Sequence, residues 1–258
     1  MKVVILAGGY GTRLSEETSL KPKPMVEIGE EPILWHIMKI YSHYGYNDFI
    51  ICLGYKGNII KDYFINYHSM HSNLTLSLSN GTITASESHS ENWRVQLIDT
   101  GSEVMTGGRL KRIEKYIDDD TFLMTYGDGV SNVNISNLVA FHREHNKLVT
   151  MTAVKPEGRF GLIHINKEGN VSEMVEKPPG DGEWVNGGFF VIDKTALKYI
   201  KNDSTIWERG PLQELSKAGE LKAFQHQGFW KPMDTLNDKR ELEALWNSGK
   251  APWMVWKQ

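Results

Sequence analysis

The spacing of apolar positions along the chain changes between two periods, and their order predicts an α/β fold. Short continuous apolar runs are typical of strands buried on both faces, and apolar positions every three to four residues are typical of amphipathic helices. Strands are predicted at 2–5, 47–53, 93–98, 122–126, 148–154, 188–192 and 221–226. Helices are predicted at 32–41, 56–67, 110–117, 135–146, 194–200, 211–218 and 237–246. The β-α-β-α order at the start favours a parallel sheet.

Strict period-two alternation marks a hairpin that leaves the main sheet. Residues 74–78 alternate between apolar and polar, Asn80-Gly81 follows, and residues 82–84 resume the alternation. Asn-Gly is the dipeptide that a type I′ hairpin turn favours. A second hairpin-like pair is predicted at 158–165 and 171–176.

The chain shows no internal repeat, low-complexity stretch or linker, so we expect one domain over residues 1–258. About 1–235 would form the catalytic core, and 236–258 the C-terminal helix and tail. Its 40% apolar and 24% charged residues are ordinary for a globular protein, and the single cysteine rules out a disulfide framework.

The charge and the hydropathy of the chain exclude several classes of partner. A net charge of -3 leaves no basic excess for neutralising nucleic-acid phosphates. No apolar run approaches the roughly 18 residues of a membrane span, and the N-terminus has no secretory apolar segment. We therefore expect no nucleic-acid partner, no membrane insertion and a cytoplasmic location.

A glycine-rich loop follows the first predicted strand, at Gly8-Gly9-Tyr10-Gly11. Glycines let the backbone turn sharply and approach a ligand, and N–H groups in such a turn can converge on an anion. Arg13 and Lys23 add positive charge. The loop lacks the third glycine of the dinucleotide fingerprint and the Gly-Lys-Ser/Thr of a P-loop. We predict a polyphosphate site; an NAD(P)-dependent oxidoreductase remains an alternative.

Two carboxylates are candidates for holding a metal ion. Asp128 lies between two glycines just after the strand 122–126, at the kind of edge where open α/β sheets bind ligands. Asp234 precedes the last helix, where a simple N-cap is the alternative. Mg²⁺ typically takes one or two carboxylates together with phosphate oxygens and waters.

A polar loop late in the chain carries candidates for a second ligand. Lys177 follows Glu176 at a predicted strand end, where a lysine can reach a phosphate as a point charge. Asn186-Gly187 lies on the far side of that loop, where a sugar could approach the backbone. Solvated surface positions are the alternative.

The glycine-rich loop with Arg13 and Lys21-Pro22-Lys23-Pro24 resembles the start of the sugar-nucleotide pyrophosphorylases. The similarity extends along almost the whole chain and is greatest to the branch that uses CTP and glucose 1-phosphate. Thr106-Gly107-Gly108-Arg109 stands where thymidylyl and uridylyl branches have a Gln-rich segment with Pro-x-Gly-x-Ala. Further matching segments are 25–29, 32–38, 99–101, 110–112, 126–129 and 230–235.

The resemblance implies a single Rossmann-like nucleotidyltransferase domain with a mostly parallel mixed sheet flanked by helices. It implies in-line attack of the sugar phosphate on the α-phosphorus of CTP, giving CDP-glucose and pyrophosphate, in a homo-oligomer. UTP or dTTP in place of CTP, or a non-catalytic nucleotide-sensing member of the fold, are alternatives.

The resemblance also assigns roles to residues. Asp128 and Asp234 would hold Mg²⁺, Arg13 and Lys23 would act on the triphosphate, and Arg109 would donate hydrogen bonds to cytosine. The implied nucleotide contacts are Leu6, Ala7, Gly8, Gly9, Tyr10, Gly11, Thr12, Arg13, Lys23, Thr106, Arg109 and Gly127. The implied sugar-phosphate contacts are Glu176, Lys177, Asn186 and Gly187.

Overall fold

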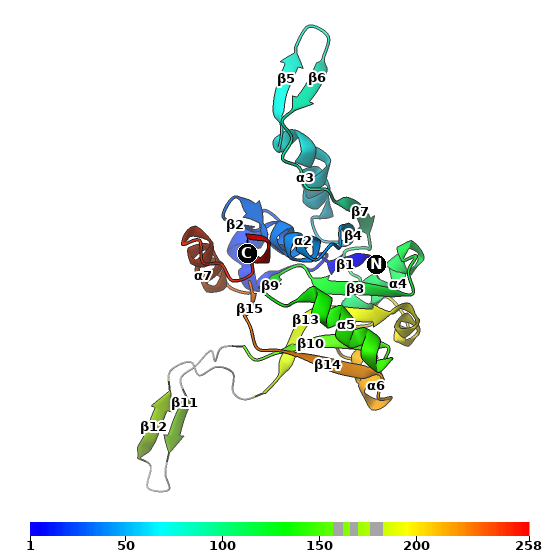
Figure 1. Ribbon diagram of the computed structural model, residues 1–258, viewed down its shortest axis with the longest axis vertical. Helices are drawn as coiled ribbons and strands as arrows, with labels where there is room; N and C mark the ends of the chain where they lie inside the picture. The colour runs from blue at the N-terminus through cyan, green and yellow to red at the C-terminus, as the bar shows by residue number, and fades with distance from the viewer. Residues whose placement is uncertain (157–161, 166–169, 176–182, 258) are drawn as a thin grey trace.

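A seven-stranded mixed sheet forms the centre of the computed structural model, which describes residues 1–156, 162–165, 170–175 and 183–257 (Figure 1). In spatial order its strands are β14 (Leu221–His226), β10 (Val149–Val154), β13 (Val185–Asp193), β8 (Thr121–Tyr126), β1 (Val3–Leu6), β4 (Asp48–Leu53) and β7 (Arg94–Asp99). β13 runs antiparallel to both of its neighbours, and the other pairs are parallel. The predicted mostly parallel mixed sheet is confirmed.

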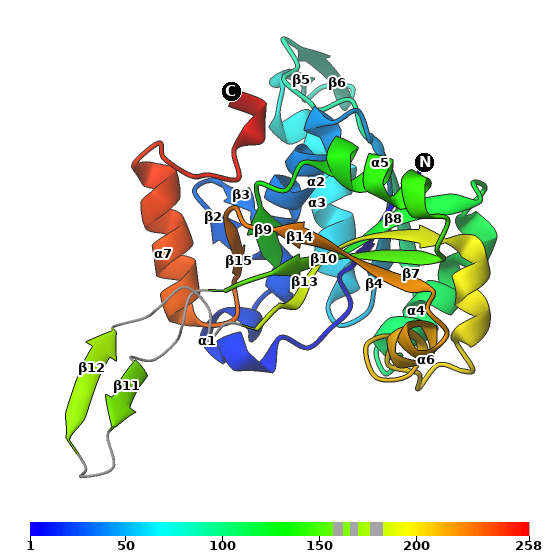
Figure 2. The same cartoon turned by 60° about the horizontal axis from the view of Figure 1, so that its bottom comes forward.

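Helices cover both faces of this sheet (Figure 2). One face packs against α2 (Ile33–His43), α3 (Gly57–Met70) and α5 (Ile135–His145). The other packs against α4 (Thr106–Ile113), the 3₁₀ helix η4 (Lys194–Tyr199) and α6 (Pro211–Lys217). In β1, Val3 and Ile5 enter the first core while Val4 and Leu6 enter the second. Both faces are therefore buried, which is why the sequence of this strand is continuously apolar.

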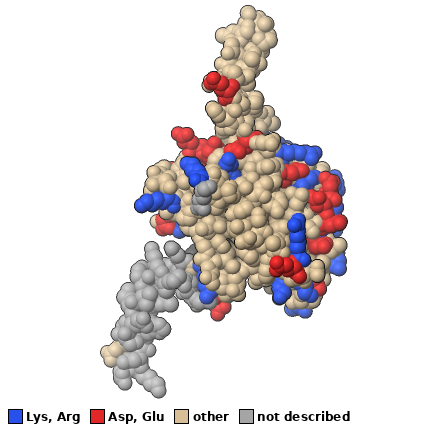
Figure 3. Space-filling view, in the orientation of Figure 1, with Lys and Arg blue, Asp and Glu red and all other residues tan. Residues whose placement is uncertain are grey.

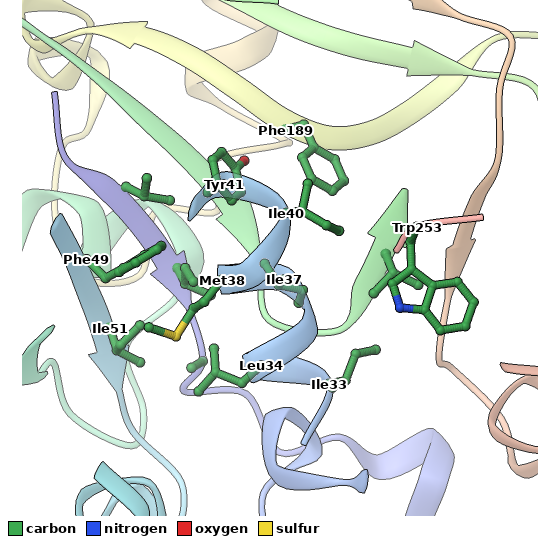
Figure 4. Packing of buried hydrophobic residues seen from close by; sticks show 14 of the residues in the cluster. Ile33, Leu34, Ile37, Met38, Ile40, Tyr41, Phe49, Ile51, Phe189 and Trp253 are labelled. Carbon is green, nitrogen blue, oxygen red and sulfur yellow. The ribbon is translucent and has the colours of Figure 1, made fainter. Parts of the chain in front are cut away.

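The helix α2 supplies much of the larger core through the apolar face that its sequence predicts (Figure 4). Tyr41 of α2 stacks on Phe189 of β13, with ring centroids 5.8 Å apart. Trp253, beyond α7 (Leu236–Asn247), is fully buried in the same cluster, so the C-terminal tail belongs to this core.

Within the described residues, four small two-stranded sheets accompany the main one. They are β2 (Glu27–Ile28) with β3 (Glu31–Pro32), β5 (Asn73–Ser77) with β6 (Thr82–Ser86), β9 (Gly129–Ser131) with β15 (Trp230–Pro232), and β11 (Leu162–Ile165) with β12 (Val171–Val175). The predicted hairpin around Asn80-Gly81 is confirmed, and the second is confirmed over 162–165 and 171–175, while positions 158–161 and 176 lie outside the described residues. The pairs β2–β3 and β9–β15 were not predicted, because two or three residues are too few to show a period.

Several details of the sequence-based prediction are wrong. The loop between β5 and β6 spans four residues, and Gly81 has a φ of +71° while Asn80 lacks the positive φ that type I′ needs. The helix predicted at 110–117 begins at Thr106 and ends at Ile113, followed by the 3₁₀ turn η3 (Glu114–Tyr116). Short turns η1 (Thr12–Leu14), α1 (Ser15–Thr18), η2 (Lys23–Met25) and η5 (Val255–Lys257) complete the elements. Among the described residues, no helix has the length and apolar character needed to cross a bilayer.

Candidate active site

The glycine-rich loop and the Asp128 loop leave the sheet side by side. β1 and β8 are parallel neighbours whose last residues, Leu6 and Tyr126, are paired in register. Gly127 N–H donates to the carbonyl of Leu6 at 3.1 Å, which ties the two loops together at their start. This edge carries the carboxyl ends of adjacent strands, where ligands bind in open α/β sheets.

A cavity of about 370 Å³ opens between these loops and the start of α4. Its walls are Leu6–Thr12, Lys23, Pro24, Ser102–Thr106, Arg109 and Tyr126–Asp128. Every predicted nucleotide-binding residue except Arg13 lines this cavity. The backbone of Arg13 lies in η1, and its side chain lies outside what the structure describes.

Lys23 joins the two predicted metal-binding carboxylates. Its Nζ donates to Asp128 Oδ2 and to Asp234 Oδ1, each at 2.7 Å. The side chains of Lys23 and Asp234 are 10% and 12% exposed, whereas that of Asp128 is 34% exposed and faces the cavity. The structure therefore brings together one cation and two carboxylates that are far apart in the sequence.

The small sheet β9–β15 explains how Asp234 reaches this position. Pro232 of β15 pairs with Gly129 of β9, and Met233 N–H donates to the carbonyl of Asp128 at 2.8 Å. Asp234 is not the helix cap that the alternative interpretation proposed. Thr235 caps α7 and forms a capping box with Asp238, so the Asp234 carboxylate can meet Lys23.

The charge of Lys23 is maintained by its carboxylate partners. Burial by itself lowers the pKa of this ammonium, but the charges and hydrogen bonds of Asp128 and Asp234 outweigh it, so the pKa of Lys23 is raised. The cluster thus contains a permanent cation at working pH.

The environment of Arg109 differs from the one that donating hydrogen bonds to cytosine, its predicted base-reading role, would require. Its Nη1 donates to the carbonyl of Leu53 and to Thr100 and Gly101, and its Nη2 donates to the carbonyls of Gly8 and Ser102. The residue is 4% exposed. These terminal N–H groups are directed at protein acceptors, so the guanidinium holds the loops of the cavity wall, including Gly8, to each other.

The two glycines before Arg109 also have a structural reason. Carbon atoms added at Gly107 and Gly108 would lie 2.7 Å and 2.5 Å from the carbonyl oxygens of Thr205 and Asp203. Both glycine N–H groups donate to Thr205. These glycines therefore permit close packing of α4 on the turn before α6.

That turn carries Glu208, which sequence analysis missed because no motif marks it. Its carboxylate accepts from Thr106 Oγ1 at 2.7 Å and from the Tyr126 hydroxyl at 2.5 Å. Asn186 Nδ2 donates to the same hydroxyl at 3.3 Å, which connects the predicted sugar-side residue to the cavity wall. Gly187 accepts a hydrogen bond from the indole of Trp230 at 2.7 Å. The other predicted sugar-side residues, Glu176 and Lys177, lie outside the described residues.

The chain has relatives among known proteins. Residues 2–231 match the family model described as "Nucleotidyl transferase", and the chain belongs to that family. It is 55% identical over its full length, and that of the relative, to glucose-1-phosphate cytidylyltransferase of Salmonella typhimurium. It is 43% identical, over 99% of the chain and 100% of the relative, to the probable glucose-1-phosphate cytidylyltransferase of Bacillus subtilis.

Solved structures confirm the fold at lower identity. HddC from Yersinia pseudotuberculosis superimposes with a TM-score of 0.69 at 23% identity, covering 95% of this chain and 99% of that one. A UDP-glucose pyrophosphorylase complexed with UDP-glucose superimposes with a TM-score of 0.68 at 15% identity, covering 96% and 98%.

Proposed function

We propose that this chain transfers the cytidylyl group of CTP to α-D-glucose 1-phosphate, giving CDP-glucose and pyrophosphate. The observation that carries the proposal is the Lys23–Asp128–Asp234 cluster beside the cavity of the glycine-rich loop. The full-length identity to cytidylyltransferases supports CTP as the nucleotide.

In this proposal the loop from Leu6 to Thr12 surrounds the triphosphate, and Arg13 and Lys23 stabilise its negative charge. A phosphate oxygen of the sugar attacks the α-phosphorus in line, and pyrophosphate leaves. Such reactions need positioning and charge stabilisation rather than a protein nucleophile.

The residues around Lys23 fit a magnesium ion. Two carboxylates converge on one cation, and hard oxygen donors are what Mg²⁺ prefers. Groups of three or more His, Cys, Asp or Glu suited to a metal do not occur in the described part of the chain. Phosphate oxygens and waters would complete the coordination. Bound there by Asp128 and Asp234, Mg²⁺ would neutralise the developing charge on the phosphates.

The sugar side of the site rests on the family resemblance. Lys177 would bind the sugar phosphate, and Glu176, Asn186 and Gly187 would lie near the hexose. The contact of Asn186 with Tyr126, which lines the cavity, supports this placement for Asn186. Use of UTP or dTTP with the same chemistry remains the second candidate.

The decisive experiment mixes CTP, Mg²⁺ and glucose 1-phosphate with the protein and measures pyrophosphate release. Asp128→Asn and Asp234→Asn should each lower kcat by several orders of magnitude. The double variant should cost little more, because the two residues act as a unit. Asp119→Asn, whose carboxylate pairs with the N-terminal amine, is the matched control. Near-normal Mg²⁺-dependent turnover in either single variant would refute the metal site, and no pyrophosphate from the wild type would refute the function.

We also propose that the enzyme is a cytoplasmic homo-oligomer, with residues 1–235 as its catalytic core and 236–258 as a C-terminal helix and tail. The hairpin β5–β6 supports self-association because it projects from the body of the molecule (Figure 1). Leu76 and Ile83 face each other across its strands and are 56% and 64% exposed. A second copy of the chain would cover this apolar face.

A further inference from the structure

The Lys23 ammonium lies where Asp128 and Asp234 converge, although the proposed function gives both carboxylates to a metal ion. Each carboxylate contacts the ammonium at 2.7 Å. A divalent metal on the same two carboxylates would lie close to the ammonium, and the repulsion between the two cations over so short a distance disfavours simultaneous binding.

We infer that Lys23 is a built-in substitute for the metal, which neutralises Asp128 and Asp234 in the nucleotide-free enzyme and must leave them before a metal binds there. This inference rests on the proposed function, because it takes the carboxylate pair as the metal site. It adds that metal and nucleotide bind together and not independently.

The burial of the cluster explains why a substitute is needed. Lys23 and Asp234 are each only 8% exposed as whole residues. Two carboxylates held close together and partly removed from water are costly unless a cation neutralises them. The ammonium supplies that charge through two charge-assisted hydrogen bonds.

The cavity explains what would release the ammonium. Lys23 lines the cavity that the proposal gives to the triphosphate. A bound triphosphate offers the ammonium new anionic partners within the same cavity and offers the metal additional oxygens. A metal ion alone offers the ammonium no replacement partner. Metal affinity should therefore be low in the nucleotide-free enzyme.

The direct test measures Mn²⁺ binding to the nucleotide-free protein by electron paramagnetic resonance. Lys23→Met and Lys23→Gln, which remove the charge, should bind Mn²⁺ about tenfold or more tightly than the wild type. This factor is expected if the ammonium occupies the cation position between the two carboxylates at least about nine-tenths of the time. Lys23→Arg should bind as weakly as the wild type. Lys21→Met, which removes a nearby lysine paired with Glu27 instead, should also leave the affinity unchanged.

Thermal unfolding provides a second readout on the same proteins. Without nucleotide, Lys23→Met should unfold at a lower temperature than the wild type, and Mg²⁺ should raise its unfolding temperature more than that of the wild type. If the neutral variants bind Mn²⁺ no more tightly than the wild type, Lys23 does not compete with the metal and the inference is wrong.

Two further outcomes keep the inference separate from folding and from the proposed function. If neither neutral variant folds, the inference is tested on the wild type, by comparing its unfolding temperature with Mn²⁺ alone and with Mn²⁺ and CTP. If Mn²⁺ alone raises the unfolding temperature of the wild type as much as Mn²⁺ with CTP does, the inference is wrong. Failure of the wild type to release pyrophosphate would overturn the proposed function, whereas the Mn²⁺ comparison would still report whether Lys23 occupies a cation site.

Discussion

Buried single side chains connect the segments that form the nucleotide cavity. Arg109 donates to carbonyls at or just beyond the ends of β1, β4 and β7, among them those of Gly8 and Gly101. Burial lowers the pKa of this guanidinium, but an arginine keeps its charge at any working pH. Removing it would break a buried hydrogen-bond network between these segments, which is more costly than losing a surface contact, although the carbonyls of Leu53 and Gly8 each keep a backbone N–H donor.

We predict that Arg109→Met lowers kcat/KM for CTP and for UTP by the same factor and lowers the free energy of unfolding by roughly 3 kcal/mol. Kinetics with both nucleotides and chemical denaturation would measure this. Arg112→Met, which loses an exposed pair with Asp203, is the control. A selective fall in the CTP-over-UTP ratio would instead favour the base-reading role that the sequence suggested.

His36 makes stability dependent on pH. It is fully buried, its Nε2 hydrogen-bonds to the carbonyl of Ile28, and its Nδ1 accepts from the indole of Trp253. Burial lowers its pKa from 6.5 to about 4. Between these values the unfolded chain binds a proton that the folded chain does not, so stability falls as the pH decreases.

We therefore expect the free energy of unfolding to fall by about 3 kcal/mol through His36 between pH 7 and pH 4. His142, His145 and His226 have lowered pKa values in the same direction, so a variant is needed to isolate the contribution. His36→Gln should have a shallower pH dependence than the wild type. His89→Gln, at an exposed position, should not. Equal slopes in all three proteins would contradict the assignment.

At the scale of elements, the glycine-rich loop is shaped by close packing as much as by its conformational freedom. A Cβ at Gly8 would lie 2.2 Å from Nη1 of Arg109, whereas a Cβ at Gly9 would have no neighbour within 4 Å. Gly11 adopts a φ of +64°, which disfavours any side chain. The three glycines therefore differ in how well each would tolerate an added side chain, although the sequence presents them as one motif.

Gly8→Ala should consequently lower the free energy of unfolding by about 1–3 kcal/mol, because the added methyl group displaces a packed guanidinium. Gly9→Ala should change it by less than about 0.5 kcal/mol. Thermal or urea unfolding of the two variants would measure the difference. Similar stability for both would show that the Arg109 contact does not constrain the loop.

At the scale of the whole molecule, the hairpin β5–β6 presents an exposed apolar face that a second protein surface could cover. Residues 73–86 contain no Asp, Glu, Lys or Arg, and the tip of the projection carries no charged colour in Figure 3. One face carries Leu74, Leu76 and Ile83, and the other carries the pair Thr75 and Thr84. An isolated two-stranded hairpin is marginally stable in water, so its apolar face is expected to be covered.

We predict that Leu76→Lys with Ile83→Lys shifts the protein to a smaller species in light scattering coupled to size exclusion. Thr75→Lys with Thr84→Lys places the same charge on the opposite face and should leave the mass unchanged. A wild type that is already monomeric at micromolar concentration would contradict the proposed self-association.

The sequence by itself determined the elements and the loops that follow them. Strand and helix periods are local properties, so they identified the strands of the main sheet, its principal helices and both hairpins. The place of Asp128 just after β8 could also be predicted, because ligands bind at the carboxyl edge of a parallel sheet.

The tertiary structure decided which side chains meet. Lys23 lies 105 residues from Asp128 and 211 from Asp234. The pairing of β1 with β8 and that of β9 with β15 bring the segments that carry these residues together. The contacts of Glu208 with Thr106, and those of Arg109 with the carbonyls of Gly8 and Leu53, also join segments that are distant in the sequence. Local patterns reflect the conformational preferences of neighbouring residues, whereas these contacts depend on how the whole chain closes on itself.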